Sequence, residues 1–451
     1  MAGINGARLK KLIISLSALF LMGSLSGQNP IVPPGVYIAD PSAHAWKDGK
    51  LYVYGSRDES PKYFCSWRHD VLSTADLKTW TITPNAFASK GPGDEVSYSD
   101  APLYAPDCQF WNGTYYLFFC IASGKNTEGV ATSKSPVGPF TAGKPIDLKG
   151  INEIDPCVFI DDDGQAYYIW GQFQAKVAKM KPGLTEIDTA TIHDNVVTEK
   201  DHFFHEGGYM IKRNGIYYFI YADMSRSGRP TCIGYSTGKS PFGPFTYGGV
   251  IIDNDRCDPG NWNNHGSVVE FIGQWFVFYH RATHNSFTMR KACVEPIEFR
   301  TDGSIKEAEM TTQGASGPLN PVNKMDAERA CLLHGNVRVQ ALTADNEELA
   351  GIRNDDKAAY KYFDFGAGVD SLFVQVTPGL NPGKIDIAID APWGESIGII
   401  DVPGNGDGKM QKTLSCKIRG ASGKHALWLR FSGKGDDIFS VDWFQFSLMT
   451  K

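Results

Sequence analysis

The sequence has few of the features that mark several common protein classes. Its nine cysteines are scattered over 451 residues without a CxxC pair, so neither a zinc site nor a dense disulfide framework is indicated. We expect buried thiols instead, although an oxidising compartment would allow one or two disulfides. Charged residues are only 21% of the chain and the formal net charge is −6, which argues against a general nucleic-acid binder.

Long apolar runs and long amphipathic helices are also missing, apart from one run at the N-terminus. Basic residues within 8–11 precede an apolar run at 12–22, and small residues follow at 23–27. This order is typical of a secretory signal peptide, and the run is too short to span a bilayer comfortably. We therefore predict that residues 1–27 are a cleaved signal peptide and that the protein is secreted or periplasmic, with no membrane span. The alternative is a buried N-terminal helix.

Aromatic residues and glycine, in contrast, are plentiful and recur in a pattern. Five segments share a polar turn, a glycine and an aromatic-rich apolar run, and four of the five turns are Asx-Gly. The turn glycines are Gly49, Gly113, Gly164, Gly215 and Gly273. Asx-Gly before a β-rich run is typical of a hairpin, and a four-stranded unit that recurs about every 40–60 residues is typical of a propeller blade. The sequence thus predicts an all-β fold with a five-bladed β-propeller over residues 28–320.

The remainder of the chain follows a different pattern. Residues 311–323 are rich in Gly, Pro and Ser and are expected to form a linker. Seven short alternating segments follow, from YKYFDF to FSVDWFQF, with loop residues between them. This spacing predicts an antiparallel β-sandwich of jelly-roll type over residues 321–451.

Charged residues stand at equivalent positions of the inner strands of the propeller repeat, where they contribute nothing to core packing. The residues eight or nine positions before the turn glycines are Asp40, Ala105, Asp155, Glu206 and His265. The innermost strands of all blades start near the central axis, so we expect these side chains to converge there. Carboxyl groups gathered at one point are candidates for acid–base chemistry. The alternative is that the Asp-Pro pairs are ordinary turn dipeptides.

At these residues the sequence resembles glycoside hydrolase family 43, the five-bladed propeller enzymes that act on plant cell-wall glycans. The matching motifs are ADP at 39–41, YAPD at 104–107, IDP at 154–156, EGG at 206–208 and NHGS at 264–267. The resemblance implies that Asp40 is the general base, that Asp155 orients and tunes, and that Glu206 is the general acid. It also implies hydrolysis with inversion, in which an acid protonates the leaving oxygen while a base activates water on the opposite face of the sugar. Nearby acids favour the protonated form of a carboxyl group, which suits Glu206 to that task.

Further site residues follow from the same resemblance. Arg290 is similar to a family arginine that reaches the sugar or the acid, with Arg281 as a weaker alternative. His265 is expected near the propeller axis, either as a structural hydrogen-bonding group or close to a calcium ion through water. Three aromatic residues could stack on the sugar or belong to the blade core. These are Phe64, Trp67 and Tyr104.

The C-terminal segment resembles a family 6 carbohydrate-binding module. Its loop at 404–411 lacks the tryptophan that such modules often carry there, and Trp393 alone offers a thin aromatic platform. The module is therefore expected either to bind glycan weakly or to brace the propeller. Glu328 and Asp442 resemble the structural calcium ligands of that module.

Together these features predict a secreted glycoside hydrolase that acts on oligo- or polysaccharides of hemicellulose or pectin. An exo-acting α-L-arabinofuranosidase or β-xylosidase is favoured, and the alternatives are an endo-arabinanase, an exo-β-1,3-galactosidase, a non-catalytic glycan-binding propeller and a retaining fructosidase-type enzyme. No cofactor is expected beyond a structural calcium ion, and no nucleic-acid or protein partner is indicated.

Overall fold

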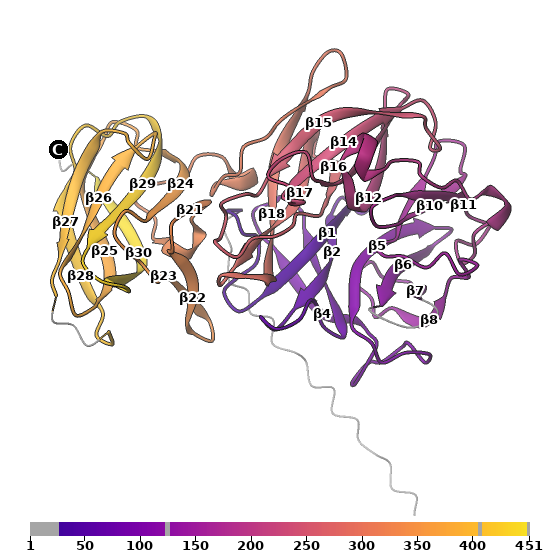
Figure 1. Ribbon diagram of the computed structural model, residues 1–451, viewed down its shortest axis with the longest axis horizontal. Coiled ribbons are helices and arrows are strands. Elements are labelled where there is room, and N and C mark those ends of the chain that lie inside the picture. The colour runs from indigo at the N-terminus through magenta and orange to yellow at the C-terminus, as the bar shows by residue number, and fades with distance from the viewer. Residues whose placement is uncertain (1–26, 122–126, 405–407, 449–451) are drawn as a thin grey trace, which may run out of the picture.

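The computed structural model describes residues 27–121, 127–404 and 408–448 (Figure 1). The predicted signal peptide lies outside these residues, except for Gly27. Strands dominate: the described helices are the four-residue α1 (Glu199–His202) and three short 3-10 helices, η1 (Thr189–Thr191), η2 (Gly314–Ser316) and η3 (Ala327–Arg329). None of the described helices has the length and apolar character needed to cross a membrane.

The N-terminal part consists of five antiparallel sheets that follow one another along the chain. The first comprises β1 (Tyr37–Ala45), β2 (Leu51–Asp58), β3 (Arg68–Thr74) and β4 (Thr81–Ala88), and the second β5 (Leu103–Trp111), β6 (Thr114–Ile121), β7 (Glu128–Ser133) and β8 (Thr141–Pro145). The third comprises β9 (Cys157–Ile160), β10 (Ala166–Trp170) and β11 (Lys176–Lys179). The fourth comprises β12 (Phe204–Arg213), β13 (Ile216–Asp223), β14 (Cys232–Gly238) and β15 (Phe245–Asp253), and the fifth β16 (Ser267–Phe271), β17 (Gln274–Thr283), β18 (Ser286–Phe299) and β19 (Ile305–Lys306).

These sheets are the five blades of a β-propeller. The innermost strands β1, β5, β9, β12 and β16 contact one another in this order, and β16 also contacts β1, so the blades surround one axis. The five predicted hairpins are confirmed, because each turn glycine joins the first two strands of a blade in the left-handed conformation, with φ between 74° and 83°. Glycine suits these positions because a side chain there would be strained.

The C-terminal part is a β-sandwich of two antiparallel sheets, drawn in orange and yellow in Figure 1. One sheet has the order β22 (Arg338–Thr343), β23 (Asn346–Ala350), β30 (Phe439–Leu448), β25 (Val369–Pro378) and β28 (Lys412–Lys417), with β20 (Met325–Asp326) paired to β30. The other has the order β21 (Leu332–His334), β24 (Lys357–Asp364), β29 (Lys424–Gly433), β26 (Gly383–Ile389) and β27 (Ser396–Val402). All seven predicted segments lie in strands, and their alternating apolar residues form the core between the sheets.

The segment between the two parts is packed, which its polar composition did not suggest. Thr311 is buried and donates a hydrogen bond through Oγ1 to Glu295 of the propeller at 2.8 Å. Backbone hydrogen bonds then join Gln313 to Lys361 and Leu319 to Tyr362 of the sandwich. Polar residues are buried here because each finds a partner on one of the two domains.

All nine cysteines are free thiols in this structure, and eight of them are buried. This agrees with their predicted role as small apolar side chains.

Candidate active site

The inner strands deviate from regular pairing at the position where the carboxylates stand. Register shifts interrupt β1 after Ala39, β5 after Tyr104 and β12 after Glu206. The residues Asp40, Ala105, Asp155 and Gly207 adopt left-handed conformations, with φ of 52°, 25°, 61° and 68°. Left-handed conformations outside glycine are uncommon and concentrate at functional sites.

This geometry corrects the predicted equivalence of Glu206 with Asp40 and Asp155. The left-handed residue of the fourth blade is Gly207, so Glu206 stands one position earlier than the aspartates do in their blades. A Cβ atom on Gly207 would lie 2.7 Å from the ring of His265, which leaves room only for glycine. The fourth blade therefore supplies its carboxyl group from the preceding residue.

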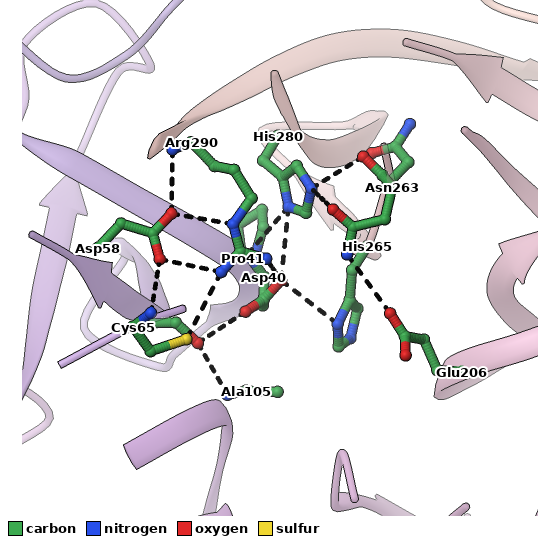
Figure 2. Close-up of polar contacts among 12 residues, drawn as sticks. Asp40, Pro41, Asp58, Cys65, Ala105, Glu206, Asn263, His265, His280 and Arg290 are labelled. Atoms are coloured by element: carbon green, nitrogen blue, oxygen red, sulfur yellow. Dashed lines mark hydrogen bonds and ion pairs between the residues drawn. The ribbon is translucent and has the colours of Figure 1, made fainter. Parts of the chain in front are cut away.

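Asp40 is buried among hydrogen-bond donors (Figure 2). Its Oδ2 accepts from the hydroxyl of Ser56 at 2.7 Å, and its Oδ1 accepts from Nη1 of Arg290 at 2.9 Å. Burial by itself raises the pKa of Asp40, but Arg290, His265, His280 and the Ser56 hydrogen bond outweigh burial and lower the pKa to about 2. Asp40 is thus held as a carboxylate, the form required of a general base.

His280 supports Asp40 as a neutral ring. Its Nδ1 accepts the backbone N–H of Asp40 at 3.2 Å, so the ring proton belongs on Nε2, which lies 3.1 Å from the backbone oxygen of Asn263. Burial and the charge of Arg290 lower the pKa of His280 to about 3. His280 therefore fixes the backbone of Asp40 and carries no charge there.

Arg290 connects Asp40 to a second buried aspartate, Asp58. Nε and Nη2 of Arg290 each donate to one oxygen of Asp58 at 2.9 Å, and the guanidinium carbon lies 5.0 Å from the centre of the Phe64 ring. This two-pronged contact fixes the plane of the guanidinium group, so that Nη1 points at Asp40. Arg290 was expected to reach the sugar or the acid, but the carboxylates that it meets are Asp40, the expected base, and Asp58. The alternative, Arg281, instead contacts Tyr279 and Glu295 away from this pocket.

Asp155 has a different environment from Asp40. It is buried, its backbone N–H donates to the sulfur of Cys120 at 3.5 Å, and among the described contacts no arginine or lysine pairs with its carboxyl group. Burial and the neighbouring carboxyl groups of Glu206 and Asp40 raise the pKa of Asp155 well above its usual range. A proton is therefore retained on this side of the site.

Glu206 is half-buried and held by two side-chain amides. Nε2 of Gln172 donates to Oε2 at 2.8 Å, and Nδ2 of Asn263 lies 3.4 Å from Oε1. Amides orient a carboxyl group without adding a positive charge beside it. Figure 2 shows the ring of His265 between Asp40 and Glu206, with Nδ1 3.6 Å from Asp40 Oδ1 and 3.9 Å from Asp155 Oδ2.

These side chains line one pocket of about 260 Å³ at the propeller axis. The predicted site residues that line it are Asp40, Phe64, Tyr104, Asp155, Glu206, His265 and Arg290. Trp67 is the exception: the structure does not place it in the pocket. Its indole N–H donates to the backbone oxygen of Asp100 at 2.7 Å, and Tyr63 and Lys90 cover its ring.

Five further residues of the lining were not predicted from the sequence. They are Ile154, Gln172, His205, Trp262 and Asn263. Four of them stand within three positions of predicted residues in the chain, so a search of the neighbours of Asp155, Glu206 and His265 would have found them. Gln172 carries no such signal, because only the folding of the third blade brings it to Glu206.

The residues predicted to bind calcium do not form an assembled metal site in the described part of the chain. No group of three or more His, Cys, Asp or Glu side chains that could hold a metal ion occurs there. Both oxygens of Asp442 accept amide hydrogen bonds, from Asn346 and Gln411, whereas Oε2 of Glu328 is buried without a hydrogen-bond partner. Burial and Asp326 raise the pKa of Glu328 to about 8. Calcium at His265 or at these residues stays a prediction.

A pocket with one carboxylate held ionised by an arginine, two further carboxyl groups and flanking aromatic residues is the equipment of an acid–base hydrolase of sugars. The family model of glycosyl hydrolases family 43 matches residues 27–305, and that of the family 6 carbohydrate binding module matches residues 326–448. The chain belongs to glycosyl hydrolases family 43, and it is a glycoside hydrolase whose substrates are carbohydrates.

Several characterised proteins are similar to the chain over most of its length. An arabinoxylan arabinofuranohydrolase of Bacillus subtilis (strain 168) is 29% identical, with 94% of this chain and 93% of that protein covered. A crystal structure of a family 43 arabinoxylan arabinofuranohydrolase from Bacillus subtilis in complex with cellotetraose is 28% identical, has a TM-score of 0.54, and covers 94% of this chain and 99% of its own.

A second solved structure matches the propeller. It is a family 43 beta-xylosidase/alpha-arabinofuranosidase from a compost microbial metagenome, in complex with xylotriose and in calcium-free form. It is 29% identical, has a TM-score of 0.54, and covers 63% of this chain and 98% of its own.

Proposed function

We propose that the protein is an exo-acting α-L-arabinofuranosidase or β-xylosidase that removes terminal pentose units from plant cell-wall glycans. The names of the similar proteins support this substrate class. The small pocket, of about 260 Å³, supports exo action, because it suits the end of a glycan better than the middle of a chain. The observation that carries the proposal is that one pocket holds two differently supported carboxyl groups. Arg290 keeps Asp40 ionised, whereas a side-chain amide orients Glu206.

In this proposal Asp40 is the general base and Glu206 the general acid. Asp40 accepts a proton from water while the water oxygen attacks the anomeric carbon. The bond from that carbon to the leaving oxygen breaks, and Glu206 gives its proton to the leaving oxygen. Asp155, whose neighbours include Glu206, acts as a positioning residue. Attack from the face opposite the leaving group inverts the anomeric configuration.

We also propose that the protein acts outside the cytoplasm, after removal of residues 1–27. The support is the order of basic, apolar and small residues in that segment. N-terminal sequencing of protein recovered from the medium or periplasm tests this, and an intact N-terminus in the cytoplasm would contradict it.

The central experiment is a panel of nitrophenyl glycosides and arabinoxylan oligosaccharides, with the product anomer followed by NMR. Activity on arabinofuranosides or xylosides with inverted product is expected. Activity confined to internal arabinan bonds, or to galactosides, would favour the endo-arabinanase or the exo-β-1,3-galactosidase instead. Binding without turnover on any substrate would favour the non-catalytic propeller.

A further inference from the structure

An exposed aromatic residue, Phe173, directly follows Gln172 of the pocket lining and has a fixed conformation. It follows β10, its side chain is 52% exposed, and its backbone is left-handed with a φ of 62°. Its N–H donates to the backbone oxygen of His205 at 2.6 Å, and its own oxygen accepts from the N–H of Glu199 at 2.9 Å. An apolar side chain held in solvent by an unfavoured backbone conformation points to a function.

Both neighbours of Phe173 belong to the acid side of the pocket. Gln172, the preceding residue, lines the pocket and donates to Glu206 at 2.8 Å. His205, which precedes Glu206, also lines the pocket. Its ring meets the Phe173 ring edge-on, with the ring centres 5.2 Å apart and an interplanar angle of 81°. Phe173 is therefore placed beside the group that protonates the leaving oxygen.

The leaving group of a glycan substrate is itself a sugar ring. Such a ring has an apolar C–H face that packs on aromatic side chains, and hydroxyls at its edge that need hydrogen bonds. Phe173 offers the aromatic face. His205 offers a ring nitrogen, because Glu199 engages only its Nδ1, at 3.1 Å.

We propose that Phe173 and His205 form the binding site for the leaving-group sugar, and that Phe173 supplies its stacking surface. This inference rests on the proposed function, because it takes Glu206 as the acid. The ligand is the glycosyl unit from which the terminal pentose is removed. A substrate without a sugar leaving group does not use this site.

The test compares Phe173→Ala on two kinds of substrate. Xylobiose and arabinofuranosyl-xylobiose have a sugar leaving group, whereas the corresponding glycosyl fluorides have only a fluoride ion. We expect kcat/KM to fall about tenfold on the oligosaccharides and to stay unchanged on the fluorides, since stacking on one aromatic ring is lost. Phe173→Trp should restore the oligosaccharide activity. Equal losses on both substrates, or no loss on either, would overturn the proposal.

A matched control is Phe203→Ala. Phe203 is also exposed and left-handed, with a φ of 61°, but its ring packs against Tyr247, whereas the ring of Phe173 packs against His205 of the pocket lining. It should leave both activities unchanged. If Phe203→Ala lowers the oligosaccharide activity as much as Phe173→Ala does, the effect is structural and the proposal is wrong.

A binding measurement separates this proposal from the proposed function. In an Asp40→Asn background, which leaves the acid side intact, Phe173→Ala should weaken binding of xylobiose about tenfold and leave binding of xylose unchanged. This readout needs no turnover, so it holds even if the enzyme proves inactive on pentosides. Equal weakening for both sugars would overturn the leaving-group site.

Discussion

On one side of the pocket Asp40 is surrounded by donors, one of them Arg290, whereas Asp155 and Glu206 have no arginine or lysine partner among the described contacts. Arg290, together with the hydroxyl of Ser56, lowers the pKa of Asp40 to about 2 against the effect of burial. The pKa of Asp155 is raised instead, by burial and by its acidic neighbours. The pKa values of two aspartates at equivalent places in two blades are thus shifted in opposite directions.

The difference shows that partners, and not position in the repeat, decide which carboxyl group ionises. Asp40 and Asp155 share the same left-handed backbone and the same following proline. They differ because β18 of the fifth blade brings Arg290 to Asp40, while the carboxyl group of Asp155 is buried with Glu206 as its acidic neighbour. One blade scaffold therefore supplies both the base and the proton-retaining side of an acid–base site.

The largest effects are expected from removing the base or the acid. Asp40→Asn and Glu206→Gln should each lower kcat/KM on oligosaccharides at least ~100-fold, because general acid–base steps contribute about 10²–10⁴. Steady-state kinetics on oligosaccharides and on glycosyl fluorides separate the two roles. Asp40→Asn should be equally impaired on both, whereas Glu206→Gln should retain most activity on fluorides, which need no proton. A variant with normal activity on oligosaccharides would contradict the assignment of that residue.

The next effect tests what lowers the pKa of Asp40. Arg290→Lys keeps the charge but loses the two-pronged contact with Asp58, so we expect a loss of stability of about 2 kcal/mol in chemical denaturation. Weaker attraction also lets the pKa of Asp40 rise from about 2 toward its ordinary value. Asp40 must be deprotonated to act, so the acidic limb of the kcat/KM profile should move to higher pH. An unmoved acidic limb would mean that the other neighbours of Asp40 keep this pKa low without Arg290.

A smaller effect is expected from Asp155→Asn. This change removes an acidic neighbour of Glu206, so the site should lose its catalytic proton at lower pH. The alkaline limb of the kcat/KM profile on oligosaccharides should therefore move to lower pH, while the acidic limb moves less. Measuring both limbs in one variant makes the unmoved acidic limb the internal control. An alkaline limb that stays or rises would mean that Asp155 is structural or is itself the base.

The smallest effect is expected from Trp67→Ala. Trp67 lies outside the pocket and contacts Tyr63, Lys90 and the backbone of Asp100. We expect kcat/KM to stay within about twofold of the parent, as for changes away from buried or reacting groups. Phe64→Ala is the matched comparison, because Phe64 covers Arg290 and lines the pocket. A large loss in Trp67→Ala would show that the substrate reaches beyond the pocket lining.

Much of the fold could be predicted because its signals are local. Each turn glycine adopts the left-handed φ that a hairpin needs, and each alternating segment after residue 356 forms a strand. The carboxylates Asp40, Asp155 and Glu206 could be found in the same way, since a repeat makes an unusual residue visible against its counterparts. The offset of Glu206 by one position from Asp40 and Asp155 could not be predicted. It depends on a bulge in β12 that places Gly207 against His265.

The sequence by itself determined the propeller, the sandwich and the identity of three acidic residues, since turn chemistry and two-residue periodicity act between near neighbours in the chain. Tertiary structure alone decided which acid would be ionised, because Arg290 is 250 residues from Asp40 and reaches it only when the first and last blades meet. It also decided that Gln172 holds Glu206, that Trp67 turns away, and that residues 311–323 are packed between the domains. These contacts depend on how blades and domains come together, and no local pattern encodes the distance between them.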